Sequence, residues 1–284
     1  MSRLLRAGAP FVLVLALAAG LRFVGAGLAS DGARLRPRFD GDGDVLYHAA
    51  RARRLAMTGD PLWFDPALDP PLGARVLSPP LLEAIIAGAA SAATAGAPTD
   101  AGVDAASALV PVALGVLAVG AVAALGALLL GPGHGLLAAF GLAISWSAIF
   151  YSMVGRSDQH ALEQLVFLAV LLAAAWAVDC PRGRGRRPRA LLLGLALAVS
   201  AWAWQGSALT LLVLSLAAAV DHLLGGAREP EGRRLAAVLA EGGLAGALLL
   251  ALSIGLLGPP GALRSGAVEG VSALAVATCA GAAL

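Results

Sequence analysis

Long apolar runs dominate this sequence, and their length decides which kind of fold the chain can adopt. A helix needs about 20 apolar residues to cross the hydrocarbon core of a membrane. Runs of that kind extend over residues 9–28, 105–130, 136–153, 161–178, 190–224 and 235–257. With 59% apolar and only 13% charged residues, the chain has too little polar surface for a soluble globule. The sequence therefore predicts an all-α, polytopic transmembrane helix bundle.

The basic residues predict the orientation of these helices. All 20 are Arg, and the two densest groups lie at 182–189 and 228–234. The positive-inside rule places both loops in the cytoplasm. This topology requires 79–97 to stay outside as a surface helix and 190–224 to cross twice, with a turn at 202–206. The net charge of +2 and the short Arg runs do not form a nucleic-acid-binding face.

The same topology divides the chain into three regions. Residues 1–28 form the first transmembrane helix, although two Arg residues ahead of its apolar core also fit a cleaved signal peptide. Residues 29–104 form a large first extracytoplasmic loop. Residues 105–284 form the remaining helix bundle, which carries a short polar motif at 155–163 on the same side of the membrane.

The large outer loop opens with alternating Asp and Gly residues, which include Asp42 and Asp44. An EF-hand is excluded, because the terminal Glu and the flanking soluble helices of that motif are missing. Carboxylates in this arrangement can bind a divalent cation beside a phosphorylated substrate. A solvated acidic linker is the alternative that this loop alone leaves open.

The second polar motif places Asp158, His160 and Glu163 where a helix re-enters the membrane. Ionisable groups at such positions are costly and usually functional. A carboxylate and an imidazole suit Mn²⁺ or a similar cation better than a structural zinc, for which thiolate ligands are missing. Glu163 lies one turn after His160 and can orient its ring. The structural alternative is a helix start with Ser157 as its N-cap.

These motifs resemble the N-terminal half of the STT3-type oligosaccharyltransferase family, within the GT-C class of glycosyltransferases. Asp42-Gly-Asp44, followed by Tyr47-His48 and Arg51, is similar to the first acidic motif of the family. Gly155 followed by Asp158-Gln159-His160 and Glu163 is similar to its second motif.

Two further matches and three departures accompany these motifs. Trp204-Gln-Gly206 is similar to the Trp-x-Gly of the family's helix 5/6 turn, and Pro79-Pro80 stands where members have Trp-Pro-Pro. Ser78 replaces the frequent Trp, Gln159 replaces a common His, and Arg51 lies one residue farther from the first motif than usual. The departures weaken the match of Arg51 more than that of the aspartates.

The resemblance implies transfer of an oligosaccharide from a polyprenyl-diphosphate carrier to Asn of Asn-x-Ser/Thr in acceptor proteins. It implies Asp44 as the catalytic carboxylate, which also binds the metal, and Asp158 and His160 as further ligands of Mn²⁺ or Mg²⁺. Asp42 and Glu163 are weaker candidates for this site.

Four Arg residues are candidates for binding the diphosphate: Arg51, Arg53, Arg54 and Arg156. The active site is expected on the extracytoplasmic face of the cell (inner) membrane, where the lipid of the donor stays in the bilayer.

Members of the family continue through further helices, an outer loop with a catalytic Glu and a soluble C-terminal domain. Because the chain ends within a new apolar segment that begins at Ser272, we expect it to require a C-terminal half or a partner chain.

Three other functions compete with this interpretation. Another GT-C transferase that uses polyprenyl-phosphate sugars would not be expected to carry Asp158-x-His160. A transporter would place ionisable groups near the membrane midplane rather than at one face. A non-catalytic membrane subunit stays open.

Overall fold

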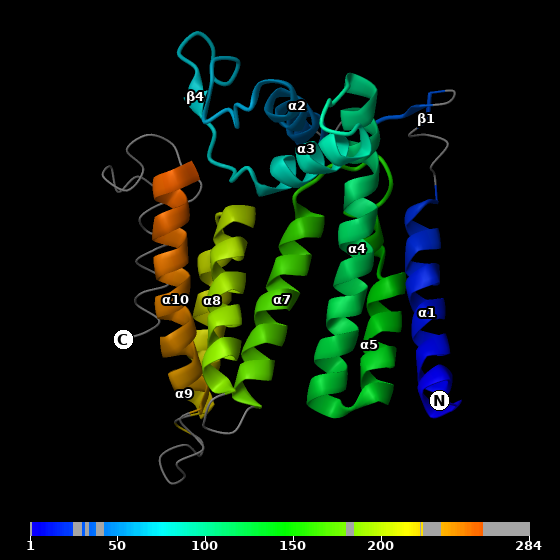
Figure 1. The fold of residues 1–284 in the computed structure, drawn as a ribbon, viewed down its shortest axis with the longest axis vertical. Coiled ribbons are helices and arrows are strands. Elements are labelled where there is room, and N and C mark those ends of the chain that lie inside the picture. The colour runs from blue at the N-terminus through cyan, green and yellow to red at the C-terminus, as the bar shows by residue number, and fades with distance from the viewer. Residues whose placement is uncertain are drawn as a thin grey trace. The chain divides into compact units, whose positions relative to one another are not determined.

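The computed structural model describes residues 2–24, 30–31, 34–37, 43–179, 185–221, 223 and 234–257. In chain order the elements are α1 Ser2–Arg22, β1 Ser30–Asp31, β2 Arg34–Leu35, α2 Gly43–Thr58, β3 Phe64–Asp65, β4 Ala74–Arg75, α3 Leu81–Ala93, α4 Asp100–Leu130, α5 Pro132–Ile144, α6 Trp146–Phe150, α7 His160–Val178, α8 Arg186–Ala203, α9 Ser207–Asp221 and α10 Arg234–Leu257. The strands form two short antiparallel pairs, β1 with β2 and β3 with β4. Helices therefore make up most of the described chain, as the sequence predicts (Figure 1).

Within the part of the chain that the structure describes, three helices are long and apolar enough to cross a membrane. They span Asp100–Leu130, His160–Val178 and Leu235–Leu256, with mean hydropathies of 2.5, 2.1 and 2.0. Shorter apolar helices lie at Gly8–Arg22, Leu81–Ala93, Pro132–Ile144 and Ser207–Val220. Many Leu side chains on these helices are exposed, as expected where lipid rather than water covers the surface. The prediction of a polytopic helical membrane protein is confirmed.

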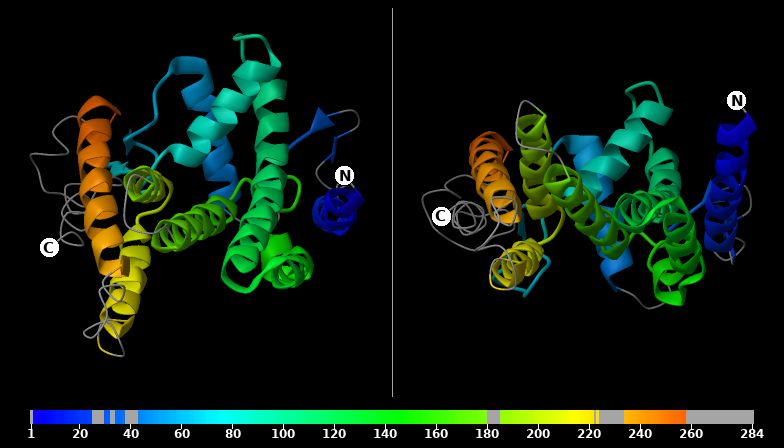
Figure 2. Two further views of the ribbon diagram at one scale, coloured as in Figure 1. Left: turned by 60° about the horizontal axis from the view of Figure 1, so that its bottom comes forward. Right: turned by 90° about the horizontal axis from the view of Figure 1, so that it is seen from below.

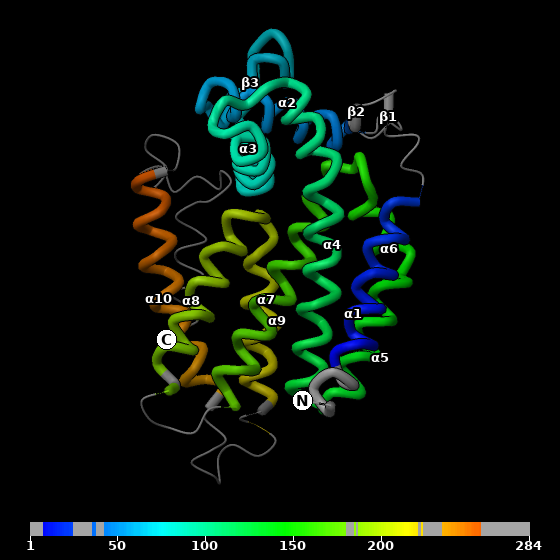
Figure 3. Tube along the Cα trace, turned by 45° about the vertical axis from the view of Figure 1, so that its right-hand side comes forward, coloured from blue at the N-terminus to red at the C-terminus, as the bar shows by residue number. Residues whose placement is uncertain are grey.

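The chain divides into two compact units, and the first comprises Met1–Leu62 and Pro80–Leu168. In this unit α1, α4 and α5 run side by side (Figures 1 and 3). Their shared core contains two Val and four Ala residues: Val14, Ala18, Val119, Ala123, Ala139 and Ala143. Such small side chains allow helix backbones to approach closely inside a membrane.

The helices α2 and α3 also belong to the first unit, but they run crosswise to α4 (Figures 1 and 3). Both contact α4 and lie at its N-terminal end. The sequence predicts a helix at 79–97 that does not run with the spanning helices, and α3 has that direction. Its position at a membrane surface stays a prediction.

The second unit comprises Trp63–Pro79 and Ala169–Leu284. Within it α8 packs on α10, as the view from below in Figure 2 shows. Gly194 faces Gly242 and Gly246 at this contact, where an added Cβ would overlap the backbone of the opposite helix. The predicted pair of helices in 190–224 is confirmed, because α8 ends before Trp204 and α9 begins after Gly206.

One predicted helix is wrong in detail. The segment 136–153 is not a single helix, since α5 ends at Ile144 and the short α6 follows after Ser145. Ser145 has an extended backbone, with ψ of 121°, which interrupts the helical hydrogen bonding. The apolar composition continues across this break, so the sequence pattern does not show it. The break lets the chain turn toward the second polar motif.

Candidate functional site

Asp44 lies in the first turn of α2, where its side chain is exposed. A carboxylate in the first turn interacts favourably with the positive end of the helix dipole. Asp42 falls outside the described residues. Of the two predicted ligands in the first motif, the structure therefore describes Asp44 alone.

The second motif begins with a buried turn that is fixed by backbone hydrogen bonds. The N–H of Val154 donates to the carbonyl of Arg22 at the end of α1 (2.9 Å), and the N–H of Gly155 donates to the carbonyl of Ala108 in α4 (3.0 Å). Gly155 has a φ of +82°, a conformation that residues with a side chain rarely adopt. Two helices thus hold the segment that leads to Asp158.

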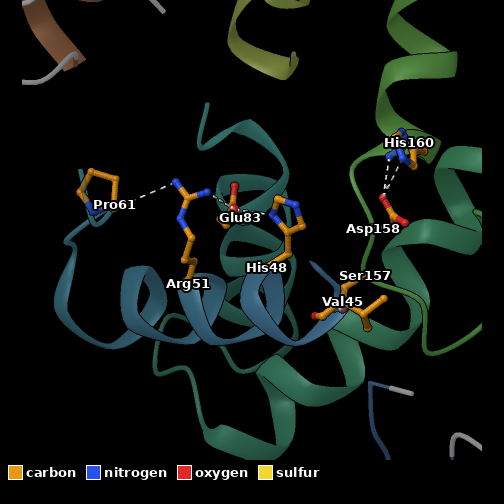
Figure 4. Close-up of polar contacts among 8 residues, drawn as sticks. All are labelled: Val45, His48, Arg51, Pro61, Glu83, Ser157, Asp158 and His160. Atoms are coloured by element: carbon orange, nitrogen blue, oxygen red, sulfur yellow. Dashed lines mark hydrogen bonds and ion pairs between the residues drawn. The ribbon is translucent and has the colours of Figure 1, made fainter. Parts of the chain in front are cut away.

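Asp158 is almost completely buried, with 2% of its surface exposed. Its Oδ1 accepts a hydrogen bond of 3.1 Å from the backbone N–H of His160 and lies 3.9 Å from Nε2 of the same residue (Figure 4). Because α7 begins at His160, Asp158 caps this helix. The cap is Asp158 rather than the expected alternative Ser157, since the first N–H of α7 donates to Asp158 and the contact of the Ser157 side chain is with the carbonyl of Val45.

The imidazole of His160 is held by groups on two sides. Its Nδ1 lies 2.7 Å from Oε2 of Glu163, as the spacing of one turn predicts. The ring of Tyr151 meets it edge-on, with 4.6 Å between the ring centroids. When the Nδ1 proton is donated to Glu163, the lone pair of Nε2 is on the side of Asp158.

Asp44 belongs to the same electrostatic environment. Its negative charge acts on His160 together with the charges of Asp158 and Glu163. The structure thus brings the first motif within electrostatic range of the second, although more than a hundred residues separate them in the sequence.

A direct hydrogen bond also joins the two motifs. Ser157, with no exposed surface, donates from its hydroxyl to the carbonyl oxygen of Val45 at 3.3 Å (Figure 4). Val45 follows Asp44, and Ser157 precedes Asp158. The bond therefore limits how far the two carboxylates can move apart.

Glu83 is not predicted as a site residue from the sequence, although it is central to the arrangement of α2. Its Oε1 lies 2.7 Å from Nδ1 of His48 and 2.7 Å from Nη1 of Arg51 (Figure 4). Glu83 and Arg51 are each 1% exposed, and His48 is 5% exposed. A single carboxylate in an otherwise apolar helix indicates that Glu83 needs a polar partner. The sequence does not show that the partners are His48 and Arg51.

Three of the four Arg candidates for diphosphate binding make ion pairs outside the acidic cluster. Arg51 is buried against Glu83, and its Nη2 donates to the carbonyl of Pro61 at 3.4 Å. Arg54 is exposed and lies 2.7 Å from Oδ2 of Asp60. Arg53 pairs with Asp100 and Asp104 at the start of α4. None of these contacts directs a guanidinium toward the acidic cluster.

Arg156 is the candidate that lies beside the acidic cluster. Its Nη2 is 3.8 Å from Oδ2 of Asp158. Its guanidinium stacks on Phe150 at 3.9 Å from the ring centroid and approaches Tyr151 at 5.5 Å. The contact with the Phe150 ring holds the Arg156 guanidinium in one orientation. Its positive charge therefore lies beside Asp158.

The described residues contain no group of three or more His, Cys, Asp or Glu side chains that is already arranged to hold a metal ion. Asp158 and His160 nevertheless fit as a pair of ligands. Their facing atoms are 3.9 Å apart, and two metal–ligand bonds of about 2.1 Å each would span that distance. Glu163 supplies the carboxylate that orients the imidazole in many metal sites.

The fold and this site define a class of protein, namely a polytopic helical membrane protein with a cluster of acidic residues and a His at one end of its helices. No protein-family model and no curated protein sequence matches the chain. Solved structures share its fold. The crystal structure of the Archaeoglobus fulgidus oligosaccharyltransferase in complex with Zn and sulfate matches with a TM-score of 0.81 at 19% identity, over 96% of this chain and 34% of that chain.

Two further structures of the enzyme from Archaeoglobus fulgidus match equally well. The oligosaccharyltransferase AglB in complex with an inhibitory peptide and a dolichol-phosphate has a TM-score of 0.81 at 17% identity, over 98% of this chain and 32% of that chain. The form tethered by a disulfide to an acceptor peptide with the NVT sequon has a TM-score of 0.82 at 18% identity, with the same coverage. The chain therefore has the fold of the N-terminal part of an archaeal oligosaccharyltransferase and spans 32–34% of these chains.

Proposed function

We propose that the chain belongs to the STT3-type oligosaccharyltransferase family and takes part in transfer of a glycan from a polyprenyl diphosphate to Asn of Asn-x-Ser/Thr. The observation that carries this proposal is the hydrogen bond between Ser157 and Val45, the chain neighbours of Asp158 and Asp44, in a fold shared with the archaeal enzyme. The resemblance of the two motifs to those of the family supports it from the sequence.

The site fits a divalent cation, which we propose to be Mn²⁺ or Mg²⁺. Asp158 and His160 would hold it from one side, and the exposed Asp44 would approach from α2. The Zn in one of the matched structures supports a divalent cation in this fold. When bound, the cation would offset the negative charge that develops on the departing diphosphate.

The residues of the chain have distinct roles in this proposal. Asp44 accepts a hydrogen bond from the acceptor amide and holds that weak nucleophile against the donor. Glu163 keeps Nε2 of His160 directed toward Asp158. Arg156 supplies a fixed positive charge for the diphosphate. Arg51 and Arg54 instead form ion pairs that hold α2 to Glu83 and Asp60.

We further propose that the site faces the extracytoplasmic side of the cell (inner) membrane. The two Arg-rich loops support this orientation through the positive-inside rule. The lipid of the donor would then remain in the bilayer while its glycan and the acceptor polypeptide are in water. Since the matched enzymes are longer, we propose that a C-terminal half or a partner chain completes the acceptor site.

The test measures glycopeptide formation in membranes of the host, where any further chain that the reaction needs is present. A fluorescent Asn-x-Thr peptide and the lipid-linked donor are added, and the product is detected by mass. Replacing Asp158 with Asn keeps the cap on α7 but removes the charge, so we expect product formation to fall at least 100-fold. EDTA should have the same effect, and Mn²⁺ or Mg²⁺ should reverse it.

Two controls accompany this test. Asp69→Asn changes an exposed Asp that belongs to neither motif and should leave the rate unchanged. A peptide with Gln in place of Asn should give no product. The chain itself has no Asn, so its own glycosylation cannot add to the signal. A wild-type rate in Asp158→Asn would overturn the proposed function.

A further inference from the structure

Glu83 connects α3 to the face of α2 that carries Asp44. Asp44, His48 and Arg51 follow one another at intervals of four and three residues, which places them on one side of the helix. Oε1 of Glu83 lies 2.7 Å from Nδ1 of His48 and 2.7 Å from Nη1 of Arg51. The buried carboxylate therefore lies against the same side of α2 as the proposed ligand.

Apolar packing alone fixes α2 poorly. Its buried residues are Val45, His48, Arg51 and Ala52, so half of the buried face is polar and the apolar half is small. Hydrophobic contact is not directional, and it would resist rotation of such a helix only weakly. Two ionic hydrogen bonds to one carboxylate are directional, and they define the rotation of α2 about its axis.

We propose that Glu83 is a positioning residue that fixes the rotation of α2 and thereby directs Asp44 toward Asp158 and His160. This inference rests on the proposed metal site. The hydrogen bond from Ser157 to Val45 holds the first turn of α2. Glu83 holds the next two turns through His48 and Arg51. Loss of either contact would let Asp44 turn away from its partners.

The test measures the affinity of the purified full chain for Mn²⁺ in lipid nanodiscs, by electron paramagnetic resonance of the free ion. Four proteins form a double-mutant cycle: the wild type, Asp44→Asn, Glu83→Gln and the double variant. We expect each single change to weaken Mn²⁺ binding about tenfold, as loss of a residue that orients a ligand does. If Glu83 acts through Asp44, the double variant should bind no more weakly than Asp44→Asn.

The matched control is Arg53→Gln, which removes exposed ion pairs of the same helix with Asp100 and Asp104 in α4. It should leave the affinity unchanged. If Glu83→Gln does not fold, then Glu83→Gln with Arg51→Gln removes both buried charges and takes its place in the cycle.

Each outcome decides one of the two proposals. Wild-type affinity in Glu83→Gln, or additive losses in the double variant, would overturn the positioning role and leave the metal site standing. Wild-type affinity in Asp44→Asn would overturn Asp44 as a ligand, and the positioning role with it.

Discussion

The Ser157 hydroxyl donates a hydrogen bond of 3.3 Å to the carbonyl oxygen of Val45, which joins two polar motifs that lie 112 residues apart in the chain. Each partner is the immediate neighbour of a proposed ligand, Asp158 in one motif and Asp44 in the other. Because neither partner is charged, the contact is not disturbed by the titration of the carboxylates beside it. This hydrogen bond holds the backbone next to Asp44 against the segment that carries Asp158.

Replacing Ser157 with Ala should weaken this junction. The Val45 carbonyl would lose its partner, and the free energy of unfolding should fall by about 1 kcal/mol. Mn²⁺ affinity should fall as well, because Asp44 and Asp158 are then less constrained. Denaturant unfolding and Mn²⁺ titration measure the two effects. Ser147→Ala removes an exposed hydroxyl and is the control; equal behaviour of the two variants would argue against the junction.

Glu163→Ala should reduce metal affinity without removing a proposed ligand. It deletes the carboxylate that lies 2.7 Å from Nδ1 of His160, so the imidazole loses its orientation and its preferred tautomer. We expect Mn²⁺ binding to weaken about tenfold. Gln164→Ala, one residue farther along the same helix, should have no effect. A Glu163→Ala protein with wild-type affinity would show that the contact does not serve the metal.

Gly115 lies where Arg22 and Ser152 meet in the first unit. Arg22 is fully buried, and its Nε donates to Oγ of Ser152 at 2.7 Å. A Cβ at Gly115 would overlap both atoms. Gly115→Ala should therefore lower the free energy of unfolding by about 1–3 kcal/mol, as overpacking does.

Gly120 in the same helix provides the control. Nothing lies within 4 Å of its ideal Cβ position, and Ala is a better helix former than Gly. Gly120→Ala should therefore leave stability unchanged or slightly higher. If both variants unfold at the same denaturant concentration, the close packing of Arg22 on Gly115 is not important for stability.

Asp60 gives the loop after α2 a dependence on pH. The backbone N–H of Leu62, and then the guanidinium of Arg54, hold the pKa of Asp60 below its usual value. A carboxyl group whose pKa is lowered by folding stabilises the fold above its ordinary pKa of about 3.9 and loses this contribution as the pH falls through the lower value. The difference in thermal unfolding between wild type and Asp60→Asn should therefore vanish at acidic pH. A difference that persists there would contradict the assignment.

The sequence predicted the parts of the fold that depend on composition and failed where a contact depends on partners far along the chain. Apolar length located the spanning helices, and the spacing of His160 and Glu163 predicted their contact. The break at Ser145 was missed because the apolar pattern continues through it. Glu83 was missed because its partners lie 35 and 32 residues earlier, and no periodicity connects two helices that cross.

The Arg candidates show the same limit. Their sequence context, a cation near an acidic motif, is alike for Arg51, Arg54 and Arg156. The structure separates them, because burial assigns the first to Glu83 and an exposed ion pair assigns the second to Asp60. Only tertiary structure distinguishes a cation that stabilises a helix from one that stands beside a site.

Arg156→Met should therefore affect the donor selectively. It retains much of the side-chain volume over Phe150 but removes the charge beside Asp158. Since a hydrogen bond to a charged group contributes about 1.5–3 kcal/mol, the KM for the lipid-linked donor should rise about tenfold or more. The KM for the acceptor peptide should not change. Arg54→Gln, which alters an Arg that pairs with Asp60, should change neither constant. Equal increases in both KM values for Arg156→Met would mean that Arg156 supports the site as a whole rather than the diphosphate.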